Sequence, residues 1–287
     1  VQAYVFVATT GRSGTVSLCR IFEHCVEGVV CFHEPHPVMF SDYPRRQGID
    51  REEYFRERFF KLKRIYIKRG ALGHKYYVET NHQFIKTFAL AAIPYFGSKT
   101  RIIHLKRDPV SVGLSFYCLD SVPGKTPRGH YYMLDPEDQS NIIQVRELLD
   151  EHSEFGHDLY KCLWYWYEIE ARVKQMKERF PSANWVTIRT EQLNDKLALQ
   201  TMFQELGMPV DLDRLENMVP RSENTRVEEK KGTLDWERCD EMNRKLRTKI
   251  EESYGRNFLL DHNDTSRNGS QDKREASGHN QCFNVGV

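Results

Sequence analysis

The sequence has little of several features that would assign a function at once. Its 287 residues include 42 Lys and Arg against 41 Asp and Glu, and the net charge of +1 excludes a globally basic surface for nucleic acid. No apolar run is long enough to span a membrane, and the start has no signal-peptide pattern. The seven cysteines show neither a CxxC pair nor zinc-site spacing, so a reduced compartment is expected. We expect no nucleic-acid or membrane partner, and any anion site must be local.

The composition is that of a soluble globular protein, with 39% apolar and 29% charged residues. From Asp261 onward the sequence is polar and poor in large apolar side chains. Such a segment cannot bury enough apolar surface to fold. The sequence therefore predicts a folded domain over residues 1–260 and a disordered tail over residues 261–287.

The stretch from Tyr4 to Cys19 reads YVFVATTGRSGTVSLC. A short β-branched run predicts a buried strand, and apolar residues at helical spacing predict a helix that begins near Thr15. A small, polar loop with two glycines lies between them. In this arrangement free backbone N–H groups and the positive end of the helix dipole converge on the loop, which favours a bound phosphate. The alternative is a tight strand-to-helix turn with an exposed Arg12.

The loop departs from the nucleoside-triphosphate pattern, which has Gly-Lys-Ser/Thr at the start of the helix. Here Gly14 precedes Thr15 and no lysine follows, while the cation of the loop is Arg12. The sequence thus predicts a phosphate site that lacks the lysine normally placed over β- and γ-phosphates.

Polar side chains follow two further predicted strands. Val29–Phe32 leads into His33-Glu34-Pro35, and His74–Val78 leads into a segment that ends at His82. The carboxyl ends of strands in open α/β sheets face the ligand crevice. Glu34 and His82 are therefore candidate bases, against the alternative that they are ordinary loop and helix-start residues.

A fourth strand, Thr100–Arg107, leads into Asp108-Pro109, a helix N-cap followed by proline at the first helical position. Ser115 lies two helical turns further on. An arginine at the strand end and this serine can hold one phosphate from two sides. The alternative is a salt-bridged arginine and an ordinary helical serine.

The remaining segments complete an alternating pattern of helices and strands. We expect a loop acting as a lid at 121–132, two helices within 138–179 with a buried aromatic run at 164–167, and a fifth strand at 184–189. Further helices are expected at 49–68, 84–92, 196–206, 211–218 and 236–254.

In combination these motifs resemble the sulfotransferase family. Gly11 to Thr15 resembles its 5′-phosphosulfate loop, and Leu105 to Pro109 with Ser115 resembles its 3′-phosphate motif. Weaker likenesses are Thr187 to Leu193 and Lys230-Lys231-Gly232. The resemblance implies an α/β fold, with a parallel sheet flanked by helices on both faces and related to P-loop kinases. It also implies the donor 3′-phosphoadenosine 5′-phosphosulfate, no metal, and a small-molecule or carbohydrate acceptor with a hydroxyl or amine.

By position, the resemblance implies that Arg12 stabilises charge on the leaving phosphate and that Ser13, Gly14 and Thr15 cradle the 5′-phosphate. Other residues expected to bind the donor are Gly11, Val16, Ser17, Arg107, Ser115, Lys231 and Gly232. The catalytic base is expected to be Glu34, with His82 and His33 as further candidates.

The chain departs from the cytosolic enzymes of the family. Val16 replaces a second threonine, and the Lys-Thr-His-Leu-Pro motif is absent. His33-Glu34-Pro35 is more similar to the branch that uses a glutamate after the second strand. A cytoplasmic location is expected, with the Golgi lumen as the alternative if an N-terminal anchor preceded Val1. Two rival functions stay open: a nucleotide kinase of related fold and a non-catalytic module that binds adenosine bisphosphate.

Overall fold

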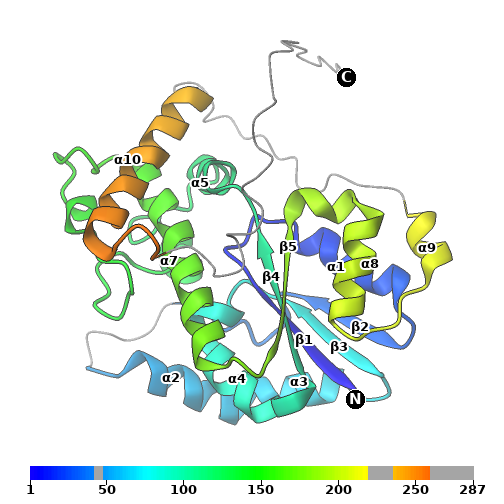
Figure 1. The fold of residues 1–287 in the computed structure, drawn as a ribbon. Coiled ribbons are helices and arrows are strands. Elements are labelled where there is room, and N and C mark those ends of the chain that lie inside the picture. The colour runs from blue at the N-terminus through cyan, green and yellow to red at the C-terminus, as the bar shows by residue number, and fades with distance from the viewer. Residues whose placement is uncertain (42–47, 219–234, 259–287) are drawn as a thin grey trace, which may run out of the picture.

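The structure is a computed structural model that describes residues 1–41, 48–218 and 235–258. Its centre is a five-stranded sheet in the order β2-β3-β1-β4-β5, with every neighbouring pair parallel. The strands are β1 (Ala3–Ala8), β2 (Val29–His33), β3 (Tyr76–Thr80), β4 (Thr100–Lys106) and β5 (Asn184–Arg189). The predicted fold class is thereby confirmed as α/β, with a parallel sheet and helices on both faces (Figure 1).

The helices are connected to the sheet in chain order, and short π- and 3₁₀-helical turns (η) adjoin several of them. They are α1 (Thr15–Cys25), α2 (Arg51–Arg58), η2 (Phe59–Lys63), α3 (Arg64–Gly70), η3 (Phe84–Phe88), α4 (Ala89–Phe96), η4 (Gly97–Lys99), α5 (Pro109–Cys118), α6 (Pro127–Tyr132), η5 (Arg146–Leu149), α7 (Asp158–Arg179), η6 (Thr190–Asn194), α8 (Lys196–Glu205), α9 (Leu212–Glu216) and α10 (Trp236–Tyr254).

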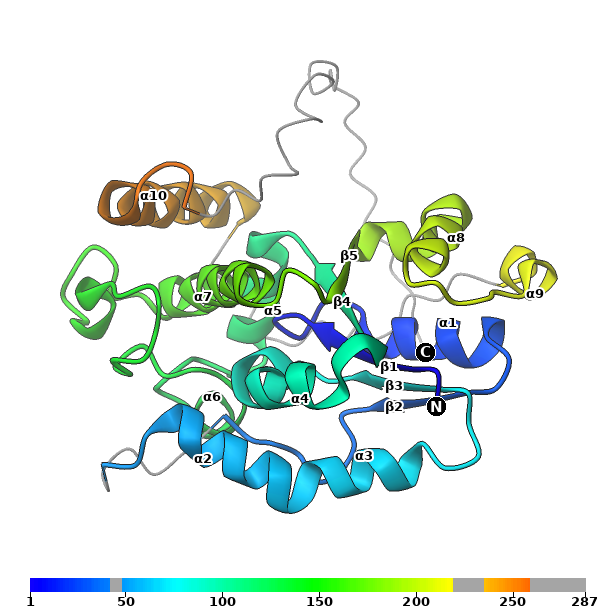
Figure 2. The same ribbon diagram turned by 60° about the horizontal axis from the view of Figure 1, so that its bottom comes forward.

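Alternation along β1 divides the core into two layers. Val5 and Val7 face a cluster that includes residues of α1, α8 and α9, whereas Phe6 and Ala8 face a larger cluster built from α2 to α5, α7 and α10. Successive side chains of a strand point to opposite faces, so a central strand buried on both sides reads as a continuous apolar run. Figure 2 shows α1, α8 and α9 on one side of the sheet and α3 and α4 on the other.

Two of the sequence-based expectations are wrong. The segment expected to be a loop at 121–132 contains α6, which begins at Pro127 and is capped by the Thr126 side chain. The segment 138–179 contains one α-helix, α7, instead of two. Before α7 the backbone is irregular, because the buried Glu168 carboxylate accepts hydrogen bonds from the N–H groups of Ile142 (3.1 Å) and Ile143 (2.8 Å). A side chain from α7 thus replaces the helical hydrogen bonds there.

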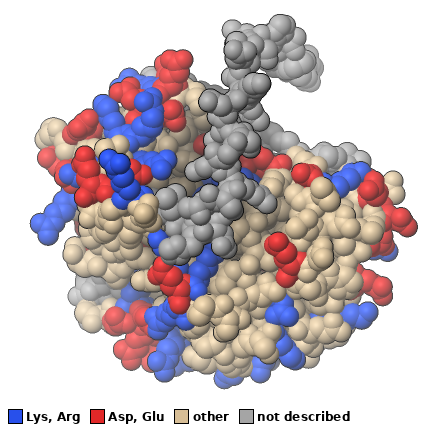
Figure 3. Space-filling view, viewed as in Figure 1, with Lys and Arg blue, Asp and Glu red and all other residues tan. Residues whose placement is uncertain are grey.

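The surface carries both signs of charge. On the face shown in Figure 3, Lys and Arg side chains are interspersed with Asp and Glu around the periphery, in keeping with the net charge of +1. Within the described residues, no helix is both long and apolar enough to cross a membrane. The predicted tail at 261–287 lies outside the described residues.

Candidate active site

The loop between β1 and α1 has a left-handed backbone at three of its positions. The φ angles of Gly11, Arg12 and Gly14 are 83°, 57° and 85°. A side chain at Gly14 would lie 2.9 Å from Leu193 and 3.3 Å from Thr190, and one at Gly11 would lie 3.3 Å from the His82 ring. Both glycines are therefore required by conformation and by space. Arg12 holds a conformation that costs a non-glycine residue roughly 1–3 kcal/mol, which is typical of functional sites.

The N-terminus of α1 opens toward the cavity beside this loop. In the described part of the chain no side chain caps it, because its N-cap is Gly14. Gly14, Thr15, Val16 and Ser17 all line the cavity. Uncapped N–H groups and the positive end of the helix dipole favour an anion at this position.

Hydrogen bonds tie the loop to β4 and α5. The Arg107 guanidinium donates to the Arg12 carbonyl oxygen at 2.7 Å, and Arg12 Nε donates to Ser115 Oγ at 2.8 Å. Thr190 Oγ1 supports the loop from the other side by donating to the Ser13 carbonyl oxygen at 2.8 Å. The structure therefore brings Arg12 together with Arg107 and Ser115, which lie about a hundred residues further along the sequence.

Two predicted donor-binding residues have their hydroxyls directed within the protein. Ser13 Oγ is buried and donates to the Gly11 carbonyl oxygen at 3.0 Å, and Ser115 Oγ accepts from Arg12. Neither belongs to the described residues that line the cavity, whereas Arg107 does. The predicted Lys231 and Gly232 lie outside the described residues.

The candidate bases come together at the ends of two neighbouring strands. β2 pairs with β3 so that His33 is level with Thr80, and the chain leaves both strands toward the same edge. His82 Nε2 lies 3.3 Å from Glu34 Oε1, and Glu34 has a left-handed φ of 47°. The side chain of Glu34 is 33% exposed and that of His82 only 9%, so the carboxylate is the more accessible member of the pair.

The third candidate, His33, also lines the cavity. Its Nδ1 lies 3.0 Å from the Thr80 carbonyl oxygen and 3.2 Å from Thr80 Oγ1. These contacts anchor its ring to the end of β3.

A buried lysine lies behind His82. Lys86 Nζ lies 2.9 Å from His82 Nδ1 and donates to the Tyr165 hydroxyl at 2.8 Å and to the Tyr132 carbonyl oxygen. Burial, followed by the charges of Lys86 and His33, lowers the pKa of His82 well below its usual value. His82 is therefore neutral at neutral pH.

A second buried lysine holds the loop that carries Glu34. Lys63 Nζ forms an ion pair with Glu79 at 2.7 Å and donates to the carbonyl oxygens of Pro35 (3.2 Å) and Pro37 (3.3 Å). Glu79 also accepts from the Tyr77 hydroxyl at 2.7 Å. A fully buried ion pair needs such additional hydrogen bonds to offset its desolvation.

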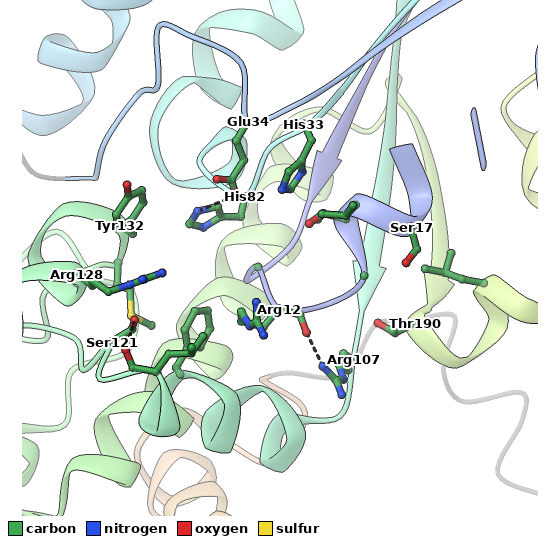
Figure 4. Close-up of a pocket in the computed structure, with 18 of the residues that line it drawn as sticks. Arg12, Ser17, His33, Glu34, His82, Arg107, Ser121, Arg128, Tyr132 and Thr190 are labelled. Atoms are coloured by element: carbon green, nitrogen blue, oxygen red, sulfur yellow. Dashed lines mark hydrogen bonds and ion pairs between the residues drawn. The ribbon is translucent and has the colours of Figure 1, made fainter. Parts of the chain in front are cut away.

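The phosphate loop, Arg107 and the candidate bases line one cavity of about 620 Å³ (Figure 4). Its phosphate-loop end carries Arg12, Arg107 and Thr190, and Glu34 and His82 lie across from them. A third wall consists of Phe116, Leu119, Ser121, Arg128, Tyr132 and Met133. Figure 4 shows the Arg128 side chain directed into the cavity. In the described part of the chain, no group of three or more His, Cys, Asp or Glu side chains is placed to hold a metal ion.

Sequence reasoning missed Lys63, Lys86, Arg128 and Tyr132. Lys63 and Lys86 are unremarkable positions in expected helices, whereas Arg128 and Tyr132 lie in the segment 121–132 that was expected to act as a lid. Only packing brings these four side chains to the site. Thr190 also lines the cavity, and it lies in the segment Thr187 to Leu193 whose likeness to a family motif the sequence did show.

No protein-family model and no curated protein matches the chain. Among solved structures, it is similar to the sulfotransferase domain from the curacin biosynthetic pathway, with 14% identity, coverage of 75% of this chain and 77% of that chain, and a TM-score of 0.46. It is also similar to a sulfotransferase from Alicyclobacillus acidocaldarius, with 16% identity, coverage of 88% of this chain and 96% of that chain, and a TM-score of 0.45. For mouse sulfotransferase SULT7A1 complexed with PAP the identity is 13%, the coverage is 90% of this chain and 88% of that chain, and the TM-score is 0.45. At such identities the likeness concerns the fold alone.

Proposed function

We propose that the chain is a sulfotransferase that moves a sulfuryl group from 3′-phosphoadenosine 5′-phosphosulfate to a hydroxyl or amine of an acceptor. The observation that carries the proposal is the arrangement of one cavity. Among the described residues, the anion cradle at one end carries two arginines, Arg12 and Arg107, and a carboxylate–imidazole pair lies opposite. The cradle suits the donor, which has a 5′-phosphate but no γ-phosphate to hold.

In the proposed reaction the acceptor oxygen or nitrogen attacks the sulfur of the donor. The bond between sulfur and the bridging oxygen breaks, and the electron pair stays on the 5′-phosphate of adenosine 3′,5′-bisphosphate. Arg12 offsets the charge that develops there, because a cation aimed at the leaving oxygen acts mainly in the transition state. The acceptor proton passes to Glu34, which is the exposed member of its pair with His82.

The donor's 3′-phosphate is assigned to Arg107. Its guanidinium lines the cavity at the end of β4 while one nitrogen holds the Arg12 carbonyl oxygen. A guanidinium has further N–H donors in a planar fork, so it can bind a phosphate and keep that bond.

A nucleotide-dependent thermal shift, followed by turnover, tests this function against its rivals. The melting temperature is measured with adenosine 3′,5′-bisphosphate, with adenosine 5′-phosphate and with ATP plus magnesium. Stabilisation by the bisphosphate above the other two supports the proposed donor, whereas the largest effect from ATP with magnesium would support a nucleotide kinase. Transfer from labelled donor to a panel of phenols, alcohols, amines and sugars then separates an enzyme from a binding module.

A further inference from the structure

The two buried lysines at the site share an uncommon local structure. Within the described ranges, π-helical turns occur at η2, which carries Lys63, and at η3, which carries Lys86. Side chains of both lysines are almost fully buried. Single π-helical turns are rare and are frequently found at functional sites. Their two lysines reach different targets: Lys63 contacts the loop backbone around Glu34, and Lys86 contacts the ring of His82.

We propose that Lys86 is a positioning residue that donates to His82 Nδ1, holds the imidazole in the tautomer whose Nε2–H faces Glu34, and thereby leaves the carboxylate as the base. This inference rests on the proposed function for its catalytic consequence. Its structural content, the tautomer of His82, is independent of any activity.

The donor count at Lys86 supports an ammonium group. The Tyr132 carbonyl oxygen can only accept, and the Tyr165 hydroxyl donates its proton to the Thr10 carbonyl oxygen at 3.2 Å, so its oxygen accepts from Lys86. With His82 Nδ1 as the third acceptor, all three ammonium protons are used. A buried cation satisfied in this way avoids the large cost of an unpaired charge.

The surrounding charges oppose each other. Burial lowers the pKa of Lys86 well below its usual value, Glu34 raises it, and Arg51 and Arg172 lower it further. The charge of His33 contributes to lowering the pKa of His82, and burial raises the pKa of Tyr165. The alternative state is a neutral amine that accepts a hydrogen bond from a protonated His82 Nδ1. That state would leave Nε2 unprotonated and make the imidazole, not Glu34, the base.

The tautomer sets what Glu34 can do. With a proton on Nε2, His82 can donate to Glu34 Oε1 but cannot accept a proton from the acceptor. The ring then orients the carboxylate. The network also connects the base to the phosphate loop, because Tyr165 joins Lys86 to the Thr10 carbonyl oxygen immediately before Gly11.

The test is nitrogen NMR of histidine-labelled protein, with the His82 signals assigned from His82→Gln. In the unaltered protein we expect one neutral tautomer, protonated at Nε2, at neutral pH, because the His82 pKa is lowered well below its usual value. Protonation at Nδ1 would overturn the proposal. This measurement needs neither donor nor acceptor, so its failure is distinguishable from failure of the proposed function.

Lys86→Met removes the ammonium and keeps most of the volume. We expect a mixture of His82 tautomers and a rise in the His82 pKa, because the charge of Lys86 is one of the causes that lower it. Donor KM should stay within about twofold. A lower kcat with an unchanged His82 tautomer and an unchanged His82 pKa would show that Lys86 serves packing alone.

Two variants serve as controls. Lys63→Met alters the other buried lysine but not a contact of His82, so it should lower stability and kcat without changing the His82 tautomer or the His82 pKa. Tyr165→Phe removes one of the three acceptors of Lys86 and retains the ring. If Lys86→Met does not fold, Tyr165→Phe should still show a second His82 tautomer, and a single Nε2–H tautomer in that variant would contradict the proposal.

Discussion

Glu34→Gln tests the proposed reaction most directly. The amide keeps the size and the planar shape of the carboxylate but cannot take up a proton at neutral pH. The contact at this position is the 3.3 Å approach of Glu34 Oε1 to His82 Nε2, which an amide oxygen can still accept. The substitution therefore removes basicity while leaving the geometry of the pair in place.

The expected effects of Glu34→Gln on kcat, on stability and on donor affinity differ in size. Loss of a general base costs roughly 10²–10⁴-fold in kcat, which corresponds to about 2.7–5.4 kcal/mol at 1.36 kcal/mol per tenfold. The Glu34 side chain is 33% exposed, and a solvent-accessible contact of this kind contributes only ~0–1 kcal/mol to stability. Glu34 faces the loop that holds Arg12 from across the cavity (Figure 4), so donor affinity should be unchanged.

The assay is initial-rate transfer from labelled donor, with adenosine 3′,5′-bisphosphate affinity and urea unfolding measured in parallel. His33→Gln is the matched control, because its ring is anchored to Thr80 and it should lose less than about tenfold in kcat. Near-normal turnover of Glu34→Gln combined with loss of activity in His82→Ala would refute the reasoning and assign the base to the imidazole.

Three further substitutions address the donor and the acceptor. Arg107→Ala should weaken the binding of adenosine 3′,5′-bisphosphate, measured by calorimetry, about tenfold to a hundredfold more than the binding of adenosine 5′-phosphate, because a charge-assisted hydrogen bond contributes ~1.5–3 kcal/mol. Equal losses of affinity would show that Arg107 acts through its bond to the Arg12 carbonyl oxygen and not through a 3′-phosphate contact. Arg12→Ala should lower kcat more than it raises donor KM, with partial recovery in Arg12→Lys, and an unchanged kcat would place it outside the chemistry. Arg128→Glu should raise KM about tenfold for the anionic acceptor 4-hydroxyphenylacetate but not for the neutral 4-ethylphenol, because an exposed ion pair contributes up to ~1 kcal/mol and reversing the charge adds repulsion. Equal changes in KM for the two acceptors would exclude an ionic contact with Arg128.

The sequence by itself determined the features that depend on local conformation. The glycines at 11 and 14 predicted a loop between the strand and the helix, and the spacing after Thr15 predicted a helix that begins near that residue, as α1 does. The apolar run of β1 predicted a buried strand. Each feature is set by the backbone preferences and side chains of a few consecutive residues, so no distant contact was needed to predict it.

Only the tertiary structure decided which of these local features meet. The approach of Glu34 to His82 depends on β2 pairing with β3, a strand order that periodicity does not encode. Tertiary contacts also explain why the helix expected before α7 does not form. There the Glu168 carboxylate, from a distant segment, accepts the backbone hydrogen bonds. Lys63 and Lys86 have the appearance of ordinary helical lysines in the sequence, since a charged side chain is normally solvated. Their burial follows from neighbouring elements that supply enough acceptors to satisfy an ammonium group.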